Sequence, residues 1–576
     1  RSWTPIEVCS VFPQPSINVN SLSFRSHTCG ELRPADVGEE VILCGWVQYL
    51  RFDMFHCFKH FILHTYSLCD LPPESVIRVK GTVRLRPDGQ ENKEMPTGEI
   101  EVLAESVEIL NVCRKLPFEI KDFVKKSESL RMQYRYLDLR SSQMQYNLRL
   151  RSQLVMKMRE YLCNVHGFVD VETPTLFKRT PGGAKEFVVP SREPGRFYSL
   201  PQSPQQFKQL LMVAGIDRYF QLARCYRDEG SKPDRQPEFT QVDIEMSFVD
   251  QAGIRGLIEG LVQYSWPVEK DPVSTPFPCI TYEKAMKDYG VDKPDTRFAM
   301  KVCSKYLDMI LHFGSLVFFV IFLYFFPKEV SVVLVKADGA LKSSLNRLMP
   351  ASAKQQLLQM AQARPGDLLL ISAGTQECVR PLLGKLRLQC AELLEGSGVA
   401  VRDPSAFHFL WVVDFPLFLP KEEDPDQLES AHHPFTAPLP EDAHLLYSLP
   451  HKVRGQHYDL VLNGCEIGGG SIRIHKASDQ QHVLETILKE DPSLLSHLLE
   501  ALDSGAPPHG GIALGLDRFL SIIVGAPSIR DVIAFPKSFR GHDLMSRAPD
   551  FVSEDELKSY HISVNWPAGD EGNQEK

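Results

Sequence analysis

The chain has 576 residues, and its 64 Lys and Arg against 73 Asp and Glu give a formal net charge of −9. This length is enough for about three or four domains, and the hydrophobic fraction of 43% is ordinary for a globular protein. The acidic balance excludes a wholly basic nucleic-acid coat, and 13 cysteines without CxxC pairs or a zinc spacing indicate reduced thiols.

The first third of the chain starts with a segment of unusual composition. Residues 1–27 are poor in acids and rich in Ser, Pro and Asn, which we interpret as a possible remnant of a targeting segment. Residues 28–112 contain three β-rich runs separated by turn residues, so a small β domain is expected there. A hinge over 113–140 follows. A helical pattern then runs from 141 to about His166, with strand-like FVDVETPTL after Gly167.

The segment PQSPQQFKQLLMVAG, residues 201–215, has the signals of a helix start. Ser203 is expected to cap a helix whose first position is Pro204. Gln205 and Lys208 then share one face near the positive end of that helix, where an anion could be received. The alternative is an ordinary capped surface helix.

Residues 224–248 predict an antiparallel hairpin with a long charged turn. In its second strand, one face is expected to carry Gln241, Asp243, Glu245 and Ser247, and the other Val242, Ile244, Met246 and Phe248. Arg227 and Glu229 point together across Asp228 in the first strand. A guanidinium fixed beside a polar cleft suits a phosphate, whereas the alternative is a solvent-facing sheet with weak salt bridges.

The region 291–405 is the least readable part of the chain. It contains helix-forming stretches such as SAKQQLLQMAQA and an apolar run at 309–326. That run approaches the length that spans a bilayer, but it includes His312 and Gly314 and hydrophilic sequence surrounds it. We therefore expect no membrane span.

The last third combines apolar strands with glycines and isolated charges. FLWVVDFPLF (409–418) predicts a strand, and in GCEIGGGSIRIH (464–475) the residues after the glycines alternate. Ile472 and Ile474 should face a core, opposite Arg473. HGGIALGLDRFLSIIVG (509–525) predicts a strand followed by a helix whose only basic residue is Arg518. AHHPFTAP (431–438) has a histidine pair, but no carboxylate at a spacing that favours zinc.

Together these segments resemble the class II aminoacyl-tRNA synthetases. GFVDVETPTL is similar to motif 1 of that class, and residues 227–229, 236–243, 459–473 and 515–518 are similar to motifs 2 and 3. Within the class, RQPEFTQVDIEMSF, AHHPFTAP, YDLVLNGCEIGGGSIRIH and GAPPHGGIALGLDR are most similar to aspartyl enzymes of the bacterial and organellar type, particularly those of animal mitochondria. The resemblance covers roughly residues 28–50, 76–300 and 380–560.

The resemblance implies an α+β fold with an antiparallel catalytic sheet flanked by helices, an N-terminal OB-fold β-barrel that reads the anticodon, and an inserted α/β domain. The implied domains are an OB-fold over 28–112, a hinge over 113–140, a catalytic domain in two parts (141–290 and 406–560), an insertion over 291–405 and a disordered tail over 561–576. The implied partners are ATP, L-aspartate, tRNA(Asp) and a second copy of the chain bound through motif 1. No membrane is involved, and the implied location is the mitochondrial matrix.

The resemblance also assigns residues. The catalytic residues would be Arg227, Glu229 and Arg518. Aspartate would be bound by Ser203, Gln205, Lys208, Arg227, Asp243, His432 and Arg473. ATP would be bound by Arg227, Asp228, Glu229, Gln236, Phe239, Glu466, Gly515, Leu516, Asp517 and Arg518. Mg²⁺ on the ATP phosphates would be held by Asp459 and Glu466, which are hard oxygen ligands.

Three departures from the family pattern stand out. Gly182 replaces a glutamate that is usual in bacterial members. Residues 50–70 lack the usual strand pair, and the apolar 309–326 run replaces family-like sequence within 301–333. Both segments have abrupt edges, which we interpret as translated intronic sequence; a transcript containing both would contradict that interpretation.

Three alternatives remain open from the sequence. An asparaginyl or lysyl enzyme belongs to the same subclass, but an asparagine pocket does not need two cations and a lysine pocket needs acids. A catalytically silent RNA-binding relative would be expected to lack Arg227, Glu466 or Arg518. A membrane protein built on 309–326 is the third alternative.

A basic stretch over residues 131–159 allows two interpretations. Its cations are Arg131, Arg135, Arg140, Arg149, Arg151, Lys157 and Arg159. They form either a solvated helix face with dimer packing, or a set of phosphate contacts for tRNA between the anticodon module and the catalytic core.

Overall fold

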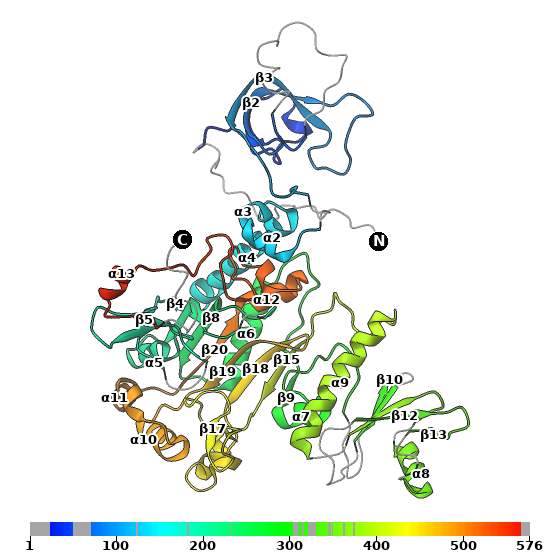
Figure 1. Ribbon diagram of the computed structural model, residues 1–576, viewed down its shortest axis with the longest axis vertical. Helices are drawn as coiled ribbons and strands as arrows, with labels where there is room; N and C mark the ends of the chain where they lie inside the picture. Colours follow the sequence, from blue (N-terminus) through cyan, green and yellow to red (C-terminus); the bar gives the residue numbers. More distant parts are fainter. Residues whose placement is uncertain are drawn as a thin grey trace. The chain divides into compact units, whose positions relative to one another are not determined.

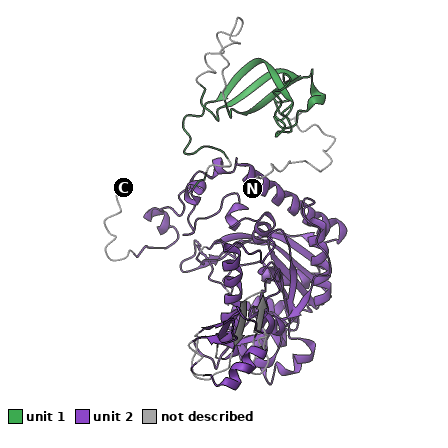
Figure 2. Cartoon of the chain, turned by 90° about the vertical axis from the view of Figure 1, so that its right-hand side faces the viewer, with its two compact units in different colours: residues 1–126 green, residues 127–576 purple. Residues whose placement is uncertain are grey.

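The computed structural model describes residues 23–49, 71–121, 125–180, 184–230, 232–302, 310–313, 316–320, 330–343, 347, 349–360, 363–372 and 375–565. They form two compact units, residues 1–126 and 127–576 (Figure 2). Several sequence-based interpretations lie outside the described residues: those on 1–22, 50–70, Gly182, half of the 309–326 run and the tail beyond 565. All cysteines in the described segments have free thiols.

The first unit contains a three-stranded antiparallel sheet in the order β1-β2-β3, formed by β1 (Glu40–Trp46), β2 (Val76–Leu85) and β3 (Ile100–Asn111). A short 3₁₀ turn, Pro34–Asp36, precedes β1. Leu32, Val41, Val83 and Ile100 form its apolar core. The β2–β3 register shifts at Lys80–Gly81, where a Cβ on Gly81 would lie 2.2 Å from the Leu103 carbonyl oxygen, so glycine permits this close approach. The sheet is compatible with an OB-fold.

The second unit is built on an eight-stranded sheet in the order β4-β7-β8-β20-β19-β18-β15-β9 (Figure 1). Its strands are β4 (Val169–Asp170), β7 (Arg218–Tyr226), β8 (Glu238–Ser247), β9 (Cys279–Thr281), β15 (Phe409–Val413), β18 (His457–Leu462), β19 (Cys465–Ile472) and β20 (His509–Gly515). Only the two edge pairs, β4 with β7 and β9 with β15, are parallel. The predicted hairpin and antiparallel sheet are confirmed.

Three helices pack on one face of this sheet. They are α4 (Ser142–Arg159), α6 (Gln251–Ser265) and α12 (Leu516–Val524). Leu150, Leu154 and Met158 of α4 recur every four residues and therefore lie on one helix face, in the same core as Ile258 and Phe519. Strand residues that alternate with polar ones complete this core. Helices thus cover the apolar face of the sheet, so a ligand-binding site is expected on the polar face.

The predicted helix after residue 141 is also confirmed. α4 continues into a π-helical segment, Glu160–Val165, and the chain turns at Gly167, which has a positive φ of 67°. Of the predicted strand 168–176, only Val169–Asp170 forms strand β4.

The inserted region forms its own five-stranded sheet in the order β10-β11-β14-β12-β13. Its elements are β10 (Ile310–Phe313), β11 (Leu316–Val320), β12 (Val330–Val335), β13 (Leu341–Lys342), α8 (Ala351–Met360), β14 (Leu368–Ser372) and α9 (Gln376–Gly396). The described parts of the 309–326 run are thus strands. Across the described part of the chain, no helix is both long and apolar enough to cross a bilayer.

The remaining elements surround the polar face of the large sheet or flank the unit. The helices are α2 (Glu128–Gln133), α3 (Arg135–Asp138), α5 (Gln205–Val213), α7 (Tyr282–Tyr289), α10 (Ala477–His482), α11 (Ser496–Asp503) and α13 (Glu554–Lys558). Short strands pair as β5 (Val188–Pro190) with β6 (Phe197–Ser199) and as β16 (Phe418–Pro420) with β17 (Leu428–Ser430). Helical turns of 3₁₀ or π type cover Pro440–Leu445, Pro450–Lys452, Val483–Leu488, Pro492–Leu495 and Ile529–Asp531.

Candidate active site

A cavity of about 970 Å³ lies over the polar face of the large sheet. Its floor comes from β8, β18, β19 and β20, and its walls from α5, the β7–β8 loop and the histidine turn at 431–435. Alternation explains the floor: along β8, Val242 and Ile244 lie in the core, whereas Gln241 and Asp243 line the cavity.

Two local predictions on this part of the chain are wrong. Phe248 does not continue the apolar face of β8; the strand ends at Ser247, and Phe248 has a positive φ of 54° and is 76% exposed. The expected side-chain cap by Ser203 does not form: α5 starts at Gln205, with Pro204 in the N-cap position and no side-chain cap bond. Because Ser203 precedes the N-cap, its side chain lines the cavity instead.

Lys208 of α5 is buried against two carboxylates of β8. Its Nζ lies 3.0 Å from Asp243 Oδ1 and 3.4 Å from Glu245 Oε2, and all three side chains are at most 2% exposed. Burial raises the pKa of Asp243, although the charge of Lys208 opposes this. Asp243 Oδ2 is buried with no hydrogen-bond partner among the described residues. Asp243 therefore keeps one acceptor for a cationic ligand.

Arg473 is 1% exposed and uses every N–H of its guanidinium. Nε and Nη2 donate to the two oxygens of Glu245 at 3.0 and 3.2 Å, and Nη2 also lies 3.5 Å from the Gly511 carbonyl oxygen. Nη1 donates to His433 Nε2 at 2.6 Å and to Ser471 Oγ at 2.9 Å. Since a guanidinium can only donate, His433 Nε2 accepts from Arg473, while the backbone N–H of Phe435 lies 3.3 Å from His433 Nδ1.

The predicted alternation after the glycines holds only in part. β19 includes the three glycines and ends at Ile472, and Arg473 forms an isolated bridge to Thr436. Ile472 packs in the main core, but Ile474 packs in a separate cluster with Leu417 and Val453. The two isoleucines are thus both buried, but in different apolar clusters.

Gly469 lies beneath two carboxylates, one from β18 and one from β19. A Cβ on Gly469 would lie 2.6 Å from Asp459 Oδ1 and 3.4 Å from Glu466 Oε1, so a glycine is needed between them. Asp459 Oδ1 is 2.8 Å from His457 Nε2, and Lys293 Nζ is 2.5 Å from Glu466 Oε2. Burial and the charge of Glu466 raise the pKa of Asp459 to about 8.

These carboxylates fit a divalent cation held jointly with a ligand. Asp459 Oδ2 is buried and has no partner in the described part of the chain, which suits a hard metal ion. The described residues contain no group of three or more His, Cys, Asp or Glu side chains placed to hold a metal alone. Further oxygen ligands would have to come from a bound molecule such as a polyphosphate.

Arg227 stands at the end of the β7–β8 hairpin. Its guanidinium carbon lies 5.1 Å from the centroid of the Phe239 ring, and its buried Nε has no partner among the described residues. Glu229 pairs with Arg235 at 3.3 Å, and Asp228 pairs with Lys185 at 3.3 Å. A cation with an unsatisfied donor in a cavity is suited to bind an anion.

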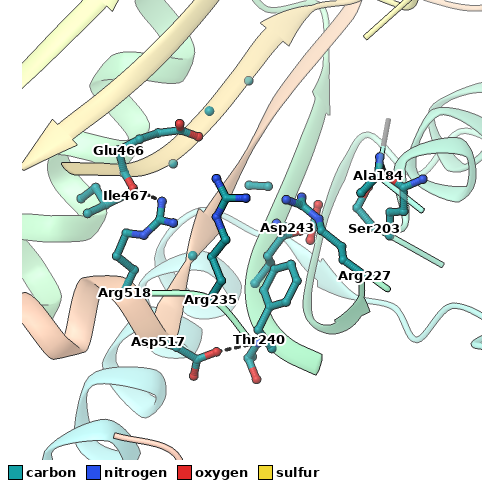
Figure 3. A pocket seen from close by; sticks show the side chains of 18 of the residues that line it. Ala184, Ser203, Arg227, Arg235, Thr240, Asp243, Glu466, Ile467, Asp517 and Arg518 are labelled. Atoms are coloured by element: carbon teal, nitrogen blue, oxygen red, sulfur yellow. Dashed lines mark hydrogen bonds between the residues drawn. The ribbon is translucent and has the colours of Figure 1, made fainter. Parts of the chain in front are cut away.

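Figure 3 shows Arg518, Arg235 and Arg227 following one another across the cavity. Arg518 Nη1 donates to the Glu466 carbonyl oxygen at 2.7 Å, so the start of α12 is tied to β19. Asp517 accepts from the backbone N of Thr240 at 2.8 Å and pairs with Arg151 at 2.5 Å. Asp517 therefore joins α12 to β8 and α4.

The cavity brings together most of the residues that the sequence singled out. They are Ser203, Gln205, Lys208, Arg227, Glu229, Gln236, Phe239, Asp243, His432, Asp459, Glu466, Arg473, Gly515, Asp517 and Arg518. Asp228 and Leu516 do not line it, because Asp228 faces Lys185 and Leu516 is part of the main core. The Gln236 amide accepts from the Lys537 backbone N at 2.7 Å and donates to its carbonyl oxygen at 3.1 Å.

Sequence reasoning gave no role to several polar residues of the cavity, among them Lys293, Arg235, His433 and His457. Lys293 comes from the segment after α7, and no local pattern indicates that it reaches the sheet. His432 stacks on His457 with ring centroids 3.4 Å apart, and burial lowers the pKa of both to about 3. His433 could have been suspected from its place beside His432; His457 alternates with Tyr458 and is therefore on the same face as Asp459.

The tRNA interpretation of the basic stretch is wrong for Arg135. That residue is 2% exposed, and its guanidinium donates to Asp138 and to the carbonyl oxygens of Arg530, Ile533 and Ala534. Arg131 likewise pairs with Asp138 and Asp531, each at 2.9 Å. These cations hold the segment after α12 rather than face solvent.

Comparison with known proteins gives concordant results. The family model for class II tRNA synthetases (D, K and N) matches residues 127–539. The mitochondrial aspartate–tRNA ligase of Rattus norvegicus is 60% identical, over 96% of this chain and 91% of its own. The corresponding protein of Homo sapiens is 59% identical, over 95% and 92%. A crystal structure of a putative aspartyl-tRNA synthetase from Leishmania major Friedlin has the same fold, with a TM-score of 0.56 at 18% identity over 91% of this chain and 96% of that one.

Proposed function

Because the chain belongs to the class II tRNA synthetases of the D, K and N group, we propose that it ligates L-aspartate to tRNA(Asp) for mitochondrial translation. The α-carboxylate of aspartate attacks the α-phosphorus of ATP, which gives aspartyl-adenylate and releases pyrophosphate. A ribose hydroxyl at the 3′ end of tRNA then takes the aspartyl group, and AMP leaves. The substrate carboxylate is itself the nucleophile, so the protein supplies orientation and charge stabilisation.

The observation that carries this proposal is Arg473, a buried cation on the floor of the cavity. A fixed guanidinium favours a side-chain carboxylate over the neutral amide of asparagine and the cation of lysine. All of its donors are engaged, so the substrate carboxylate would replace a neutral partner, and we place it on Nη1. His433 and Ser471 are the neutral partners there, whereas the bidentate Glu245 pair is expected to stay.

The ammonium group of aspartate also has a hydrogen-bond acceptor in the cavity. Asp243 Oδ2 is buried without a partner in the described residues and would accept from the ammonium, helped by Ser203 and Gln205 at the start of α5. Lys208, which pairs with Asp243 and Glu245, would help Arg473 to hold the side-chain carboxylate of aspartate.

The nucleotide would lie between the hairpin and α12. Arg227 would stabilise charge on the α-phosphate, Arg518 would act from the far side, and Phe239 would stack on adenine. The unsatisfied Nε of Arg227 supports its assignment. Its guanidinium now covers the Phe239 ring, so nucleotide binding requires the two groups to separate.

Mg²⁺ would be held by Asp459 and Glu466 together with ATP phosphate oxygens, where it would neutralise charge on the leaving pyrophosphate. The unpartnered Asp459 Oδ2 supports this assignment. An OB-fold barrel that reads the anticodon, a homodimer through motif 1 and a location in the mitochondrial matrix complete the proposal.

ATP–pyrophosphate exchange with each amino acid tests the proposal directly. Exchange that depends on aspartate, and not on asparagine or lysine, is the expected result. Exchange with asparagine or lysine would identify the other members of the subclass, and no exchange with any amino acid would identify a catalytically silent relative. Charging assays with tRNA(Asp) and tRNA(Asn) then determine the tRNA partner.

A further inference from the structure

The segment that joins α7 to the inserted sheet reaches the active site. α7 ends at Tyr289, Gly290 follows in the left-handed region, and the chain continues through Asp292, Lys293, Pro294 and Asp295. A Cβ on Gly464, in the turn between β18 and β19, would lie 2.8 Å from the Cβ of Asp295. The segment therefore packs directly against the hairpin that carries both proposed metal ligands.

This segment is held by a buried arginine of α9. Arg387 of α9 is fully buried and donates to the carbonyl oxygens of Met300 at 2.5 Å, Asp295 at 2.7 Å and Phe298 at 3.2 Å. The carboxylate of Asp295 accepts from Arg297 at 2.7 and 3.0 Å. Pro294 also restricts Lys293 to extended backbone. The position of the Lys293 backbone is thus well defined by its neighbours.

The ammonium of Lys293 lies next to a carboxylate of strand β19. Nζ lies 2.5 Å from Glu466 Oε2 and 3.8 Å from Asp292 Oδ2. Lys293 and Glu466 are 36% and 31% exposed, so the pair lies at the open side of the cavity, where exchange of partners is feasible.

We propose that Lys293 is a positioning residue that takes the place of the divalent cation on Glu466 until the metal–nucleotide complex binds. It keeps Glu466 extended into the cavity, and it moves to Asp292 when Glu466 is needed as a metal ligand. The protein thereby resists binding a free divalent cation without nucleotide, because that cation must displace a tethered ammonium. The inference rests on the proposed function of Asp459 and Glu466.

The experiment is a Mn²⁺ titration of the purified full chain without nucleotide. The concentration of free Mn²⁺ is measured at each step by electron paramagnetic resonance. Lys293→Met is expected to bind Mn²⁺ about tenfold or more tightly than wild type, since a cation next to the site has been removed. Lys293→Arg should behave like wild type because it keeps the charge. Lys301→Met is the matched control: it lies on the same segment, is half exposed and pairs with Asp288 at 3.6 Å outside the cavity.

The outcomes separate control of metal binding from a purely structural role and from nucleotide binding. If Lys293→Met and wild type bind Mn²⁺ equally, the proposal is wrong. A loss of stability would then indicate a structural role, and a loss of ATP affinity would indicate nucleotide binding. A gain that persists when Glu466→Gln is added also overturns it, because the extra ion would then bind elsewhere. If Lys293→Met does not fold, Lys293→Gln replaces it. The titration contains no ATP or aspartate, so its result is independent of the exchange assay. Equal Mn²⁺ affinities would contradict the role of Lys293 even if aspartate-dependent exchange is observed. Absence of exchange would contradict the proposed function even if the Mn²⁺ affinities differ.

Discussion

The guanidinium of Arg473 and the carboxylate of Glu245 form a bidentate pair, with N–O distances of 3.0 and 3.2 Å, in a site where both side chains are at most 2% exposed. Lys208 and Asp243 complete a group of two cations and two anions. The balanced charges explain how four ionisable side chains can be buried together. The pair therefore supports both the fold and the proposed specificity.

Arg473→Leu is expected to abolish aspartate-dependent exchange and to lower the free energy of unfolding by about 3–5 kcal/mol, because Glu245 then remains buried with one cation fewer. Urea unfolding and ATP–pyrophosphate exchange measure the two effects separately.

The double variant Arg473→Leu/Glu245→Gln is the control for that change. It removes one charge of each sign, so the Lys208–Asp243 pair remains balanced and much of the stability should return. Exchange should stay absent. A single variant as stable as wild type, or a double variant with normal exchange, would contradict the assignment of Arg473.

His433 makes the stability depend on pH. Burial first, and then the charge of Arg473, hold its pKa well below the ordinary 6.5. The unfolded chain thus binds a proton more readily, so stability is complete above about pH 6.5 and falls as the pH is lowered. For this one residue the loss between pH 7.5 and 5.5 should be about 1.4 kcal/mol.

His433→Gln should remove that share of the pH dependence, because glutamine keeps an acceptor for Arg473 and does not titrate. Urea unfolding at both pH values measures it. His451→Gln, at an exposed position, is the control and should leave the dependence unchanged. A steeper dependence in His433→Gln would show that the sign is wrong.

Arg135 illustrates how burial changes the expected effect of a charge reversal. Arg135→Glu places a carboxylate beside Asp138 and against three backbone carbonyl oxygens, and it should lower the melting temperature and reduce both exchange and tRNA charging. Arg149→Glu, on the exposed face of α4, should keep the melting temperature and exchange of wild type. Normal exchange in Arg135→Glu would contradict a structural role.

Much of the site could be predicted because it lies on regular strands. Alternation along β8 and β18 puts Asp243 and Asp459 on the face opposite the core, and the resemblance to known motifs identifies Arg227 and Arg518. Such local patterns repeat every two residues and need no knowledge of distant contacts.

The remaining parts depend on contacts that local patterns do not encode. Lys293 reaches Glu466 only because Arg387 and Gly464 position the segment before the inserted sheet, far apart in sequence. From the sequence alone, Arg135 is expected to be a surface cation. Only the fold shows that carbonyl oxygens of residues 530–534 surround it. The break after Ile472 and the turn at Phe248 were missed for the same reason: partners elsewhere in the chain, Thr436 and Pro508, replace strand pairing there.

Arg227→Ala is expected to lower kcat for exchange by about 10²–10³-fold with a smaller effect on the KM for aspartate, since its charge is needed most at the phosphorus under attack. Arg224→Ala, three residues earlier on β7, provides a matched control, because Arg224 is 47% exposed and pairs with Glu238 outside the cavity. Steady-state exchange at varied aspartate and ATP concentrations gives both constants. The unsatisfied Nε of Arg227 predicts little loss of stability, because no described carboxylate or carbonyl loses a side-chain partner at that atom. A change confined to the KM for aspartate would assign Arg227 to amino-acid binding and remove it from the phosphate.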